Sequence, residues 1–167
     1  METRTRIVKL VHTALFAALI FALTFLVRVP IPLTSGGYVN LGDTAVFLAA
    51  ALIGGPAAAV AAGVGSALAD VAAGYALYAP ATLVIKALMG LVCGALVARR
   101  PGVRAFVVAA LVAGAVMVVG YALYESALYG VRYALLAAGF NCIQWGASVL
   151  CAGLLYPVAR RVGALST

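Results

Sequence analysis

The sequence predicts an all-α integral membrane protein, a bundle of six transmembrane helices with both termini in the cytoplasm. This prediction rests on the composition, the lengths of the apolar runs and the positions of the basic residues. Of the 167 residues, 66% are hydrophobic and only 9% are charged, whereas a soluble domain carries about 25% charged residues. The mean hydropathy is +1.18. A water-soluble fold cannot hide so much apolar surface, so we expect the chain to lie in a membrane.

Six apolar runs supply the predicted helices. A spanning helix needs about 20 predominantly apolar residues, and five of the runs have roughly that length or more. The remaining run, residues 42–53, reaches only about 18 Å as a helix, so we expect a short or extended second helix. We interpret residues 1–167 as one membrane domain with helices at about 7–27, 42–53, 56–73, 81–98, 103–124 and 133–158.

The basic residues favour six spans over five. Most of the 11 Lys and Arg residues fall in three clusters. Six spans place all three clusters on one face, which the positive-inside rule makes cytoplasmic, whereas five spans leave the middle cluster outside. The net charge of +7 is therefore explained by topology and predicts no nucleic-acid partner. The clusters are Arg4, Arg6 and Lys9; Arg99, Arg100 and Arg104; and Arg160 and Arg161.

The sequence offers little for catalysis or for metal binding. It contains no HExxH, GxSxG or Walker A pattern, and its single histidine, His12, is predicted near the cytoplasmic end of the first helix. Cys93, Cys142 and Cys151 lie inside apolar runs without the spacing of metal ligands, and we interpret them as packing residues. We therefore expect no enzyme, no cofactor and no metal ion.

Small residues recur at helical spacing on the first predicted helix, at Ala14, Ala18 and Ala22, and similar rows occur on residues 56–73. Small side chains let helix backbones approach closely, which matters in lipid because packing replaces the hydrophobic driving force. Two interpretations remain open for each row. It packs inside the bundle, or it forms a docking face for another membrane subunit.

Polar and aromatic side chains gather in the outer half of the predicted bundle. An ionisable side chain in hydrocarbon costs roughly 3 kcal/mol and is a functional candidate. Aromatic walls with a few converging polar groups are typical of a small-molecule site. We therefore predict a pocket that opens to the outside of the cell, formed by Asn40, Asp70, Tyr78, Lys86, Tyr121, Tyr124, Glu125, Asn141, Gln144 and Trp145.

Structural roles remain open for several of these side chains. Asp70 and Lys86 can form an ion pair between the third and fourth helices, and Asp43 can cap the second helix, where the helix dipole favours an anion. Glu125 can pair with Arg132 across a short turn. Tyrosines near the outer surface can be interfacial belt residues, namely Tyr75, Tyr78 and Tyr129.

Two stretches resemble the substrate-binding S components of energy-coupling factor (ECF) vitamin transporters. They are residues 40–71, NLGDTAVFLAAALIGGPAAAVAAGVGSALADV, and residues 78–94, YAPATLVIKALMGLVCG. The resemblance extends over nearly the whole chain and is greatest to the riboflavin type and the hydroxymethylpyrimidine/pyridoxine type. Its most specific parts are the Gly-Asp pair at 42 and 43, the GGP turn and the IKALMG run.

The resemblance implies a protein of the prokaryotic cell membrane that binds a water-soluble vitamin or precursor from outside with high affinity. It also implies a transmembrane coupling subunit, contacted by Ala14, Ala18 and Ala22, and two cytoplasmic ATPases that drive a toppling motion. A ring of the hydroxymethylpyrimidine or pyridoxine kind suits the predicted pocket better than riboflavin, which needs a longer cavity. The alternatives are a small proton-coupled transporter or exporter that titrates Asp70 and Glu125 without ATPases, and a membrane scaffold without a ligand.

Overall fold

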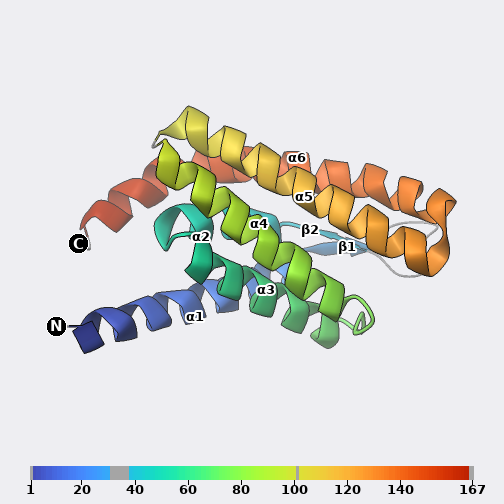
Figure 1. Cartoon of the computed structure of the whole chain (residues 1–167), viewed down its shortest axis with the longest axis horizontal. Coiled ribbons are helices and arrows are strands. Elements are labelled where there is room, and N and C mark those ends of the chain that lie inside the picture. The colour runs from blue at the N-terminus through green and yellow to red at the C-terminus, as the bar shows by residue number, and fades with distance from the viewer. Residues whose placement is uncertain (1, 31–37, 101, 166–167) are drawn as a thin grey trace.

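The structure is a computed structural model that describes residues 2–30, 38–100 and 102–165. It is a helical bundle with one two-stranded hairpin (Figure 1), so the predicted all-α class is confirmed in its main point. The hairpin was not predicted. In chain order the elements are α1 (Glu2–Leu26), β1 (Arg28–Pro30), β2 (Tyr38–Asn40), α2 (Gly42–Leu52), α3 (Gly55–Ala72), α4 (Ala79–Arg99), α5 (Val103–Tyr129) and α6 (Val131–Leu165).

Five of the described helices are long and apolar enough to cross a membrane, namely α1, α3, α4, α5 and α6. The prediction of six spanning helices is therefore supported for five of them only. With 11 residues α2 is too short by this measure, and most of its residues are buried among the other helices. It forms the centre of the bundle rather than part of its surface.

The hairpin and α2 together bring the chain back toward the end of the bundle that holds both termini (Figure 1). At about 3.3 Å per strand residue and about 1.5 Å per helical residue, β2 and α2 together reach about 26 Å. An extended segment is tolerated at membrane depth only where protein surrounds it. Here β2 pairs antiparallel with β1, with Val39 opposite Val29. Residues 31–37, in the middle of the predicted outer loop, lie outside the described residues.

The helix ends differ from the predicted ranges, most clearly where polar residues continue a helix beyond its apolar part. The first helix begins at Glu2 and not near residue 7, and α5 continues to Tyr129. Hydropathy marks the part of a helix that lipid covers, so it misses polar end turns. Between α5 and α6 the chain turns at Gly130, whose φ of 87° favours glycine.

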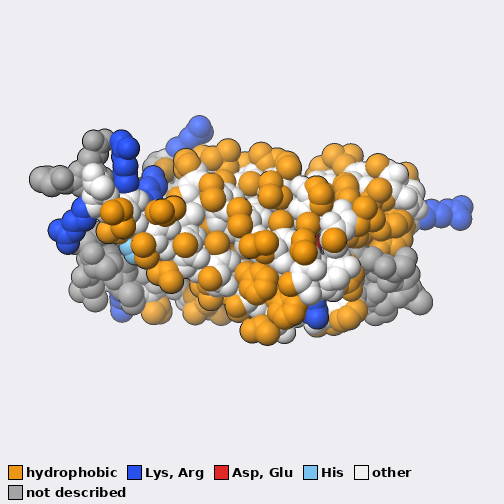
Figure 2. Space-filling view, turned by 90° about the horizontal axis from the view of Figure 1, so that it is seen from below, with side chains coloured by type: hydrophobic (Ala, Val, Ile, Leu, Met, Phe, Trp, Pro, Cys, Tyr) orange, Lys and Arg blue, Asp and Glu red, His pale blue; other side chains and the backbone are white. Residues whose placement is uncertain are grey.

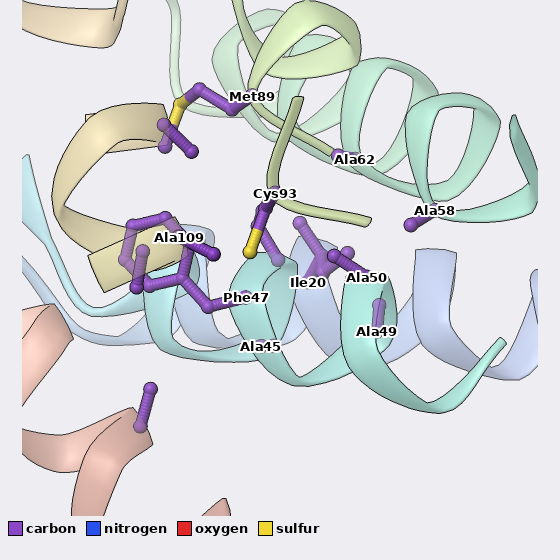
Figure 3. Close-up of a cluster of buried hydrophobic side chains, with 14 of the residues drawn as sticks. Ile20, Ala45, Phe47, Ala49, Ala50, Ala58, Ala62, Met89, Cys93 and Ala109 are labelled. Atoms are coloured by element: carbon purple, nitrogen blue, oxygen red, sulfur yellow. The ribbon is translucent and has the colours of Figure 1, made fainter. Parts of the chain in front are cut away.

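Small residues bring α3 and α4 into close contact. A side chain at Gly94 would collide with the backbone of Gly55, and one at Gly90 would lie 2.8 Å from the backbone of Ala58. This is the close backbone approach that small residues permit in membrane helices. Larger side chains fill the space around α2 (Figure 3), and those that are fully buried include Ile20, Val46, Phe47, Met89, Phe106 and Met117.

The row of small residues on α1 and the row at Ala58, Ala62 and Ser66 on α3 differ in their surroundings. On α3, Ala58, Ala62 and Ser66 are buried in the bundle, as internal packing requires. On α1, Ala14 and Ala18 are exposed. Internal packing therefore accounts for the row on α3 and does not account for the row on α1.

The surface is apolar along the length of the bundle (Figure 2). Most of the Lys and Arg side chains in this view lie toward the end that carries both termini. The connection between α4 and α5, which follows Arg99, lies at the same end (Figure 1). The three basic clusters therefore share one end of the molecule, as the topology prediction requires.

Candidate functional site

A cavity of about 40 Å³ lies in the half of the bundle away from the termini. Its walls come from β2, from the turn between α3 and α4, and from all the long helices. The lining is unusually polar for the interior of so apolar a chain, with four tyrosines, three amides, three further hydroxyl side chains and three ionisable groups. The lining residues are Thr24, Tyr38, Asn40, Ser66, Asp70, Tyr75, Tyr78, Thr82, Lys86, Tyr121, Glu125, Asn141 and Gln144.

Helical spacing explains why several of these side chains reach the cavity together. Residues four apart share one face of a helix. Thr82 and Lys86 stand in this relation on α4, and Tyr121 and Glu125 on α5. Each of these helices therefore presents a polar stripe to the cavity.

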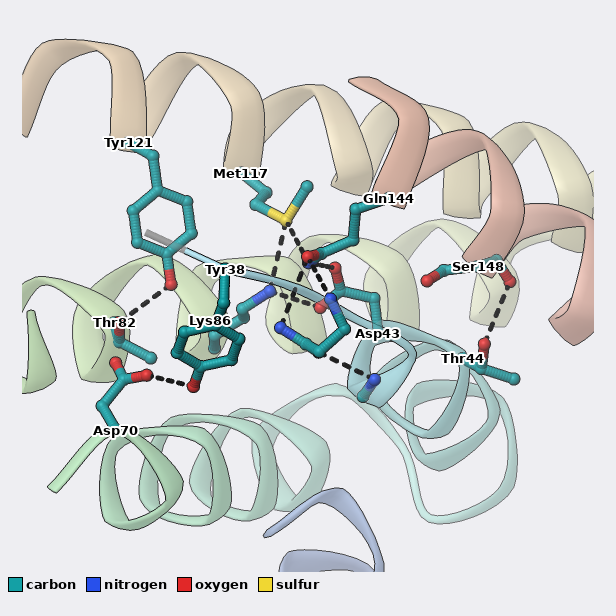
Figure 4. Close-up of polar contacts among 12 residues, drawn as sticks. Tyr38, Asp43, Thr44, Asp70, Thr82, Lys86, Met117, Tyr121, Gln144 and Ser148 are labelled. Atoms are coloured by element: carbon teal, nitrogen blue, oxygen red, sulfur yellow. Dashed lines mark hydrogen bonds and ion pairs between the residues drawn. The ribbon is translucent and has the colours of Figure 1, made fainter. Parts of the chain in front are cut away.

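The deepest part of the site is a buried ion pair between the Lys86 ammonium and the Asp43 carboxylate (Figure 4). The side chains are 3% and 1% exposed, respectively. The Lys86 Nζ atom also lies 3.2 Å from the Met117 sulfur on α5. Two opposite charges in direct contact offset much of the cost of burying each one.

Gln144 connects this ion pair to the hairpin. Its Nε2 atom donates to Asp43 Oδ2 at 2.6 Å, and its Oε1 atom accepts a hydrogen bond from the backbone N–H of Asn40 at 2.8 Å. The Asn40 side chain in turn accepts from the backbone N–H of Gly42 at 2.8 Å. The start of α2, the strand β2 and the helix α6 are therefore held in one hydrogen-bonded unit.

Three structural roles that the sequence left open are not found in the structure. Lys86 pairs with Asp43 and not with Asp70, because α2 lies inside the bundle, where its first turn reaches α4. Asp43 makes no capping hydrogen bond, since both of its oxygens are bonded to side chains of other helices. Glu125 is buried and accepts from the Tyr78 hydroxyl at 3.4 Å, whereas Arg132 is exposed.

Two further carboxylates, Asp70 and Glu125, are buried at the cavity and only partly bonded. Asp70 Oδ1 accepts from the Tyr38 hydroxyl at 2.5 Å. Within the described part of the chain, Asp70 Oδ2 and Glu125 Oε2 are buried and have no hydrogen-bond partner. Buried polar atoms are nearly always bonded, so such atoms call for a partner that is absent from the protein alone.

Tyrosine side chains form much of the cavity wall. The rings of Tyr38 and Tyr75 lie 5.0 Å apart, and the Tyr121 hydroxyl lies 2.8 Å from that of Thr82. Burial and the nearby Asp70 carboxylate raise the pKa of Tyr38 well above its usual value, so this hydroxyl stays a donor at neutral pH. Tyrosines in such a position supply flat apolar faces and polar tips to a ligand.

Eight of the ten residues predicted for the pocket line the cavity, and two do not. The Tyr124 hydroxyl donates to the backbone carbonyl of Leu77 at 2.5 Å, so this tyrosine ties α5 to the turn before α4. The Trp145 indole lies against Gly114 of α5, in the space that a side chain there would take. Both are on the predicted helices but turn away from the cavity.

Five lining residues were not among those predicted for the pocket, namely Thr24, Tyr38, Ser66, Tyr75 and Thr82. Ser66 and Thr82 stand four residues before Asp70 and Lys86, so helical spacing from these two ionisable residues was a usable signal. Tyr38 reaches the cavity from β2, which the sequence did not predict. Tyr75 was considered only as an interfacial belt residue.

Comparison with known proteins agrees with the resemblance seen in the sequence. The family model for the ECF-type riboflavin transporter, S component, matches residues 4–161, nearly the whole chain. The protein belongs to this S component family. A relative from Lactococcus lactis subsp. cremoris (strain MG1363), the thiamine precursor transporter HmpT, is 30% identical over 158 residues, covering 95% of this chain and 91% of the relative.

A second relative, an uncharacterised protein from Pyrococcus woesei, is 39% identical over 142 residues, which cover 84% of this chain and 94% of that protein. Membership makes this S component a multi-pass protein of the cell membrane and a transport subunit for vitamin uptake rather than an enzyme. An S component must recognise its vitamin in a site of its own, and the polar cavity is the candidate for it.

Proposed function

We propose that this S component binds a water-soluble vitamin or vitamin precursor in the cavity, from outside the cell, as the first step of uptake. The observation that carries this proposal is a cavity with tyrosine walls and buried, partly bonded polar groups in a chain of this family. Such a lining is typical of small-molecule sites. The basic clusters at the opposite end support a cytoplasmic position for both termini.

The favoured ligand is a single-ring compound like hydroxymethylpyrimidine or pyridoxine, with riboflavin next. Small-molecule sites commonly have volumes of about 300–1,000 Å³, so a cavity of about 40 Å³ must open even for one ring. Riboflavin, with three fused rings and a ribityl chain, requires a much larger opening. The similarity to a thiamine precursor transporter also supports a small ring.

The proposed partners are the transmembrane coupling subunit and the two cytoplasmic ATPases of an ECF module, with Ala14, Ala18 and Ala22 at the contact. Ala14 and Ala18 line an open apolar groove of about 570 Å³ between α1 and α3. The groove is bordered by exposed apolar side chains such as Val60 and Leu68. A second membrane helix can approach closely along a row of small residues.

Reconstitution tests this proposal. The protein is inserted into liposomes with and without the coupling subunit and ATPases, and entry of a panel of labelled vitamins and precursors is measured. We expect binding without the partners, and uptake only with all of them and ATP. The proposal fails if no vitamin or precursor binds.

Asp70 and Glu125 also support a second candidate, a proton-coupled transporter, because buried carboxylates with unbonded oxygens can exchange protons during transport. The same liposomes separate the two functions. Uptake or export driven by a proton gradient, without ATPases, would favour the second candidate.

A further inference from the structure

Acidic residues are concentrated at the cavity to a degree that topology does not explain. The chain has four carboxylate side chains in all. Asp70 and Glu125 line the cavity, and Asp43 lies directly behind Lys86. The fourth, Glu2, begins α1 at the opposite end of the bundle (Figure 1). A membrane protein gains nothing from placing three carboxylates in its apolar interior unless they have a task there.

The cavity holds more negative than positive groups. Lys86 is the one basic side chain among the lining residues that the structure describes, and its ammonium is bonded to Asp43. This pair is neutral as a unit. Among the described residues, neither Asp70 nor Glu125 is in direct contact with a cation, although Lys86 and the Thr82 hydroxyl lie near Asp70. The Tyr38 hydroxyl donates to Asp70 and the Tyr78 hydroxyl to Glu125.

The unbonded oxygen atoms of these two carboxyl groups are buried at the cavity. Asp70 is 5% exposed and Glu125 is 3% exposed, so bulk water does not solvate them. They come from different helices, α3 and α5, and line the same small space. A buried carboxylate without a counter-charge is unfavourable. A ligand that brings positive charge and N–H donors into this space removes that cost.

The aromatic walls favour the same kind of ligand. Tyr38, Tyr75, Tyr78 and Tyr121 surround the space that the two carboxylates border. Tyrosine faces attract cations as well as flat rings. A neutral ring would gain the stacking contacts but would bring no positive charge to the two carboxylates.

We propose that the ligand of this S component is an organic cation, a basic amino-substituted heteroaromatic ring held between Asp70 and Glu125. Its protonated ring and amino N–H groups donate to the two unbonded carboxylate oxygens. Lys86 forms no ion pair with the ligand, because its ammonium group is already paired with the Asp43 carboxylate. The inference rests on the proposed function, since it defines the charge of the ligand in the same cavity.

The test compares two probes that have the same skeleton, 4-amino-5-hydroxymethyl-2-methylpyrimidine and its 4-oxo analogue, with riboflavin as a large neutral probe. Binding to the purified full-length protein in detergent is measured by titration calorimetry. The amino probe can be held as a cation, whereas the oxo probe is neutral and has a carbonyl acceptor in place of the amino donor. We expect the amino probe to bind at least about 100-fold more tightly, because charge-assisted hydrogen bonds are roughly twice as strong as neutral ones and an unpaired buried group is penalised.

Neutral variants of similar shape identify the groups responsible. Asp70→Asn and Glu125→Gln should each lower the preference for the amino probe at least about 10-fold, which is the effect of about 1.4 kcal/mol. Glu2→Gln, at the first residue of α1, alters a carboxylate that is not among the lining residues and should leave the preference unchanged. Should either cavity variant fail to fold, the preference of the unaltered protein decides alone.

The outcomes distinguish this inference from the proposed function. Tight binding of riboflavin or of the oxo probe, with the amino probe equal or weaker, leaves vitamin binding intact and overturns the cationic ligand. A preference that survives both cavity variants unchanged overturns it as well. If none of the probes and no other vitamin or precursor binds, the proposed function fails, and the inference fails with it.

Discussion

The Lys86 ammonium on α4 is bonded to the Asp43 carboxylate in the first turn of α2, and both side chains are almost fully buried. This contact joins the central short helix to a long outer helix. Gln144 extends it to α6 and to the backbone of β2. The polar site is therefore part of what holds the bundle together, and substitutions at Lys86 act on stability as well as on the cavity.

Breaking the ion pair should destabilise the protein strongly. Lys86→Met and Asp43→Asn each leave one buried charge without its partner, which typically costs about 3–5 kcal/mol. The double variant removes both charges and should regain much of the loss. Thermal unfolding in detergent, monitored by circular dichroism, measures all three variants. Single variants as stable as the unaltered protein would contradict the pairing.

Tyr38→Phe should detach β2 from α3. The Tyr38 hydroxyl is bonded to Asp70 at 2.5 Å, so its removal takes a hydrogen bond from a buried carboxylate, at a cost of about 1–3 kcal/mol. Tyr129→Phe is the matched control, because Tyr129 is 39% exposed. The free energy of unfolding in denaturant should fall for the first variant and stay nearly constant for the second. Equal losses in the two variants would show that the Tyr38 bond does not matter.

Two glycine-to-alanine variants, one on α5 and one on α6, test whether the Trp145 indole packs against α5. A side chain at Gly114 would collide with the Trp145 indole, so Gly114→Ala should cost about 1–3 kcal/mol through overpacking. Gly139 has open space around it, so Gly139→Ala should be neutral or stabilise by up to about 1 kcal/mol. Trp145 is the single tryptophan, so its fluorescence reports the displacement directly. An unchanged spectrum in Gly114→Ala would contradict this packing.

Ala18→Leu should separate ligand binding from transport. Ala18 lines the groove between α1 and α3 and lies on the surface, so leucine there should fold normally and fill the groove. We expect unchanged vitamin binding and at least a 10-fold loss of ATP-dependent uptake, corresponding to about 1.4 kcal/mol in docking. Ala95→Leu, at an exposed position on α4, is the control. Full uptake by Ala18→Leu would exclude the groove as the docking face.

Much of this fold follows from hydropathy and charge, since five long apolar runs and three basic clusters define the helices and their direction. The hairpin did not follow, because Arg28–Pro30 and Tyr38–Asn40 are three-residue strands with no alternation long enough to recognise. Without the hairpin, the position of Tyr38 at Asp70 could not be predicted. Hydropathy also cannot show that α2 is enclosed on all sides.

The candidate site was predicted better as a region than as a set of pairs. Depth in the membrane and helical spacing brought Asp70, Lys86 and Glu125 to one half of the bundle. Which carboxylate reaches Lys86 depends on how the helices are rotated about their axes and on where α2 begins. The periodicity of apolar residues in the sequence determines neither. The same uncertainty in rotation explains Trp145, which shares a stripe with Asn141 and Gln144 but packs on Gly114.

Native mass spectrometry of the full-length protein, purified in detergent without added ligand, tests the central claim most directly. We predict one bound small molecule with the mass of a water-soluble vitamin or precursor. It should be lost from a variant that combines Asp70→Asn with Glu125→Gln and retained by Glu2→Gln. Protein that carries no such molecule and gains none from a vitamin panel, or a molecule retained equally by the cavity variant, would contradict a vitamin site in this cavity.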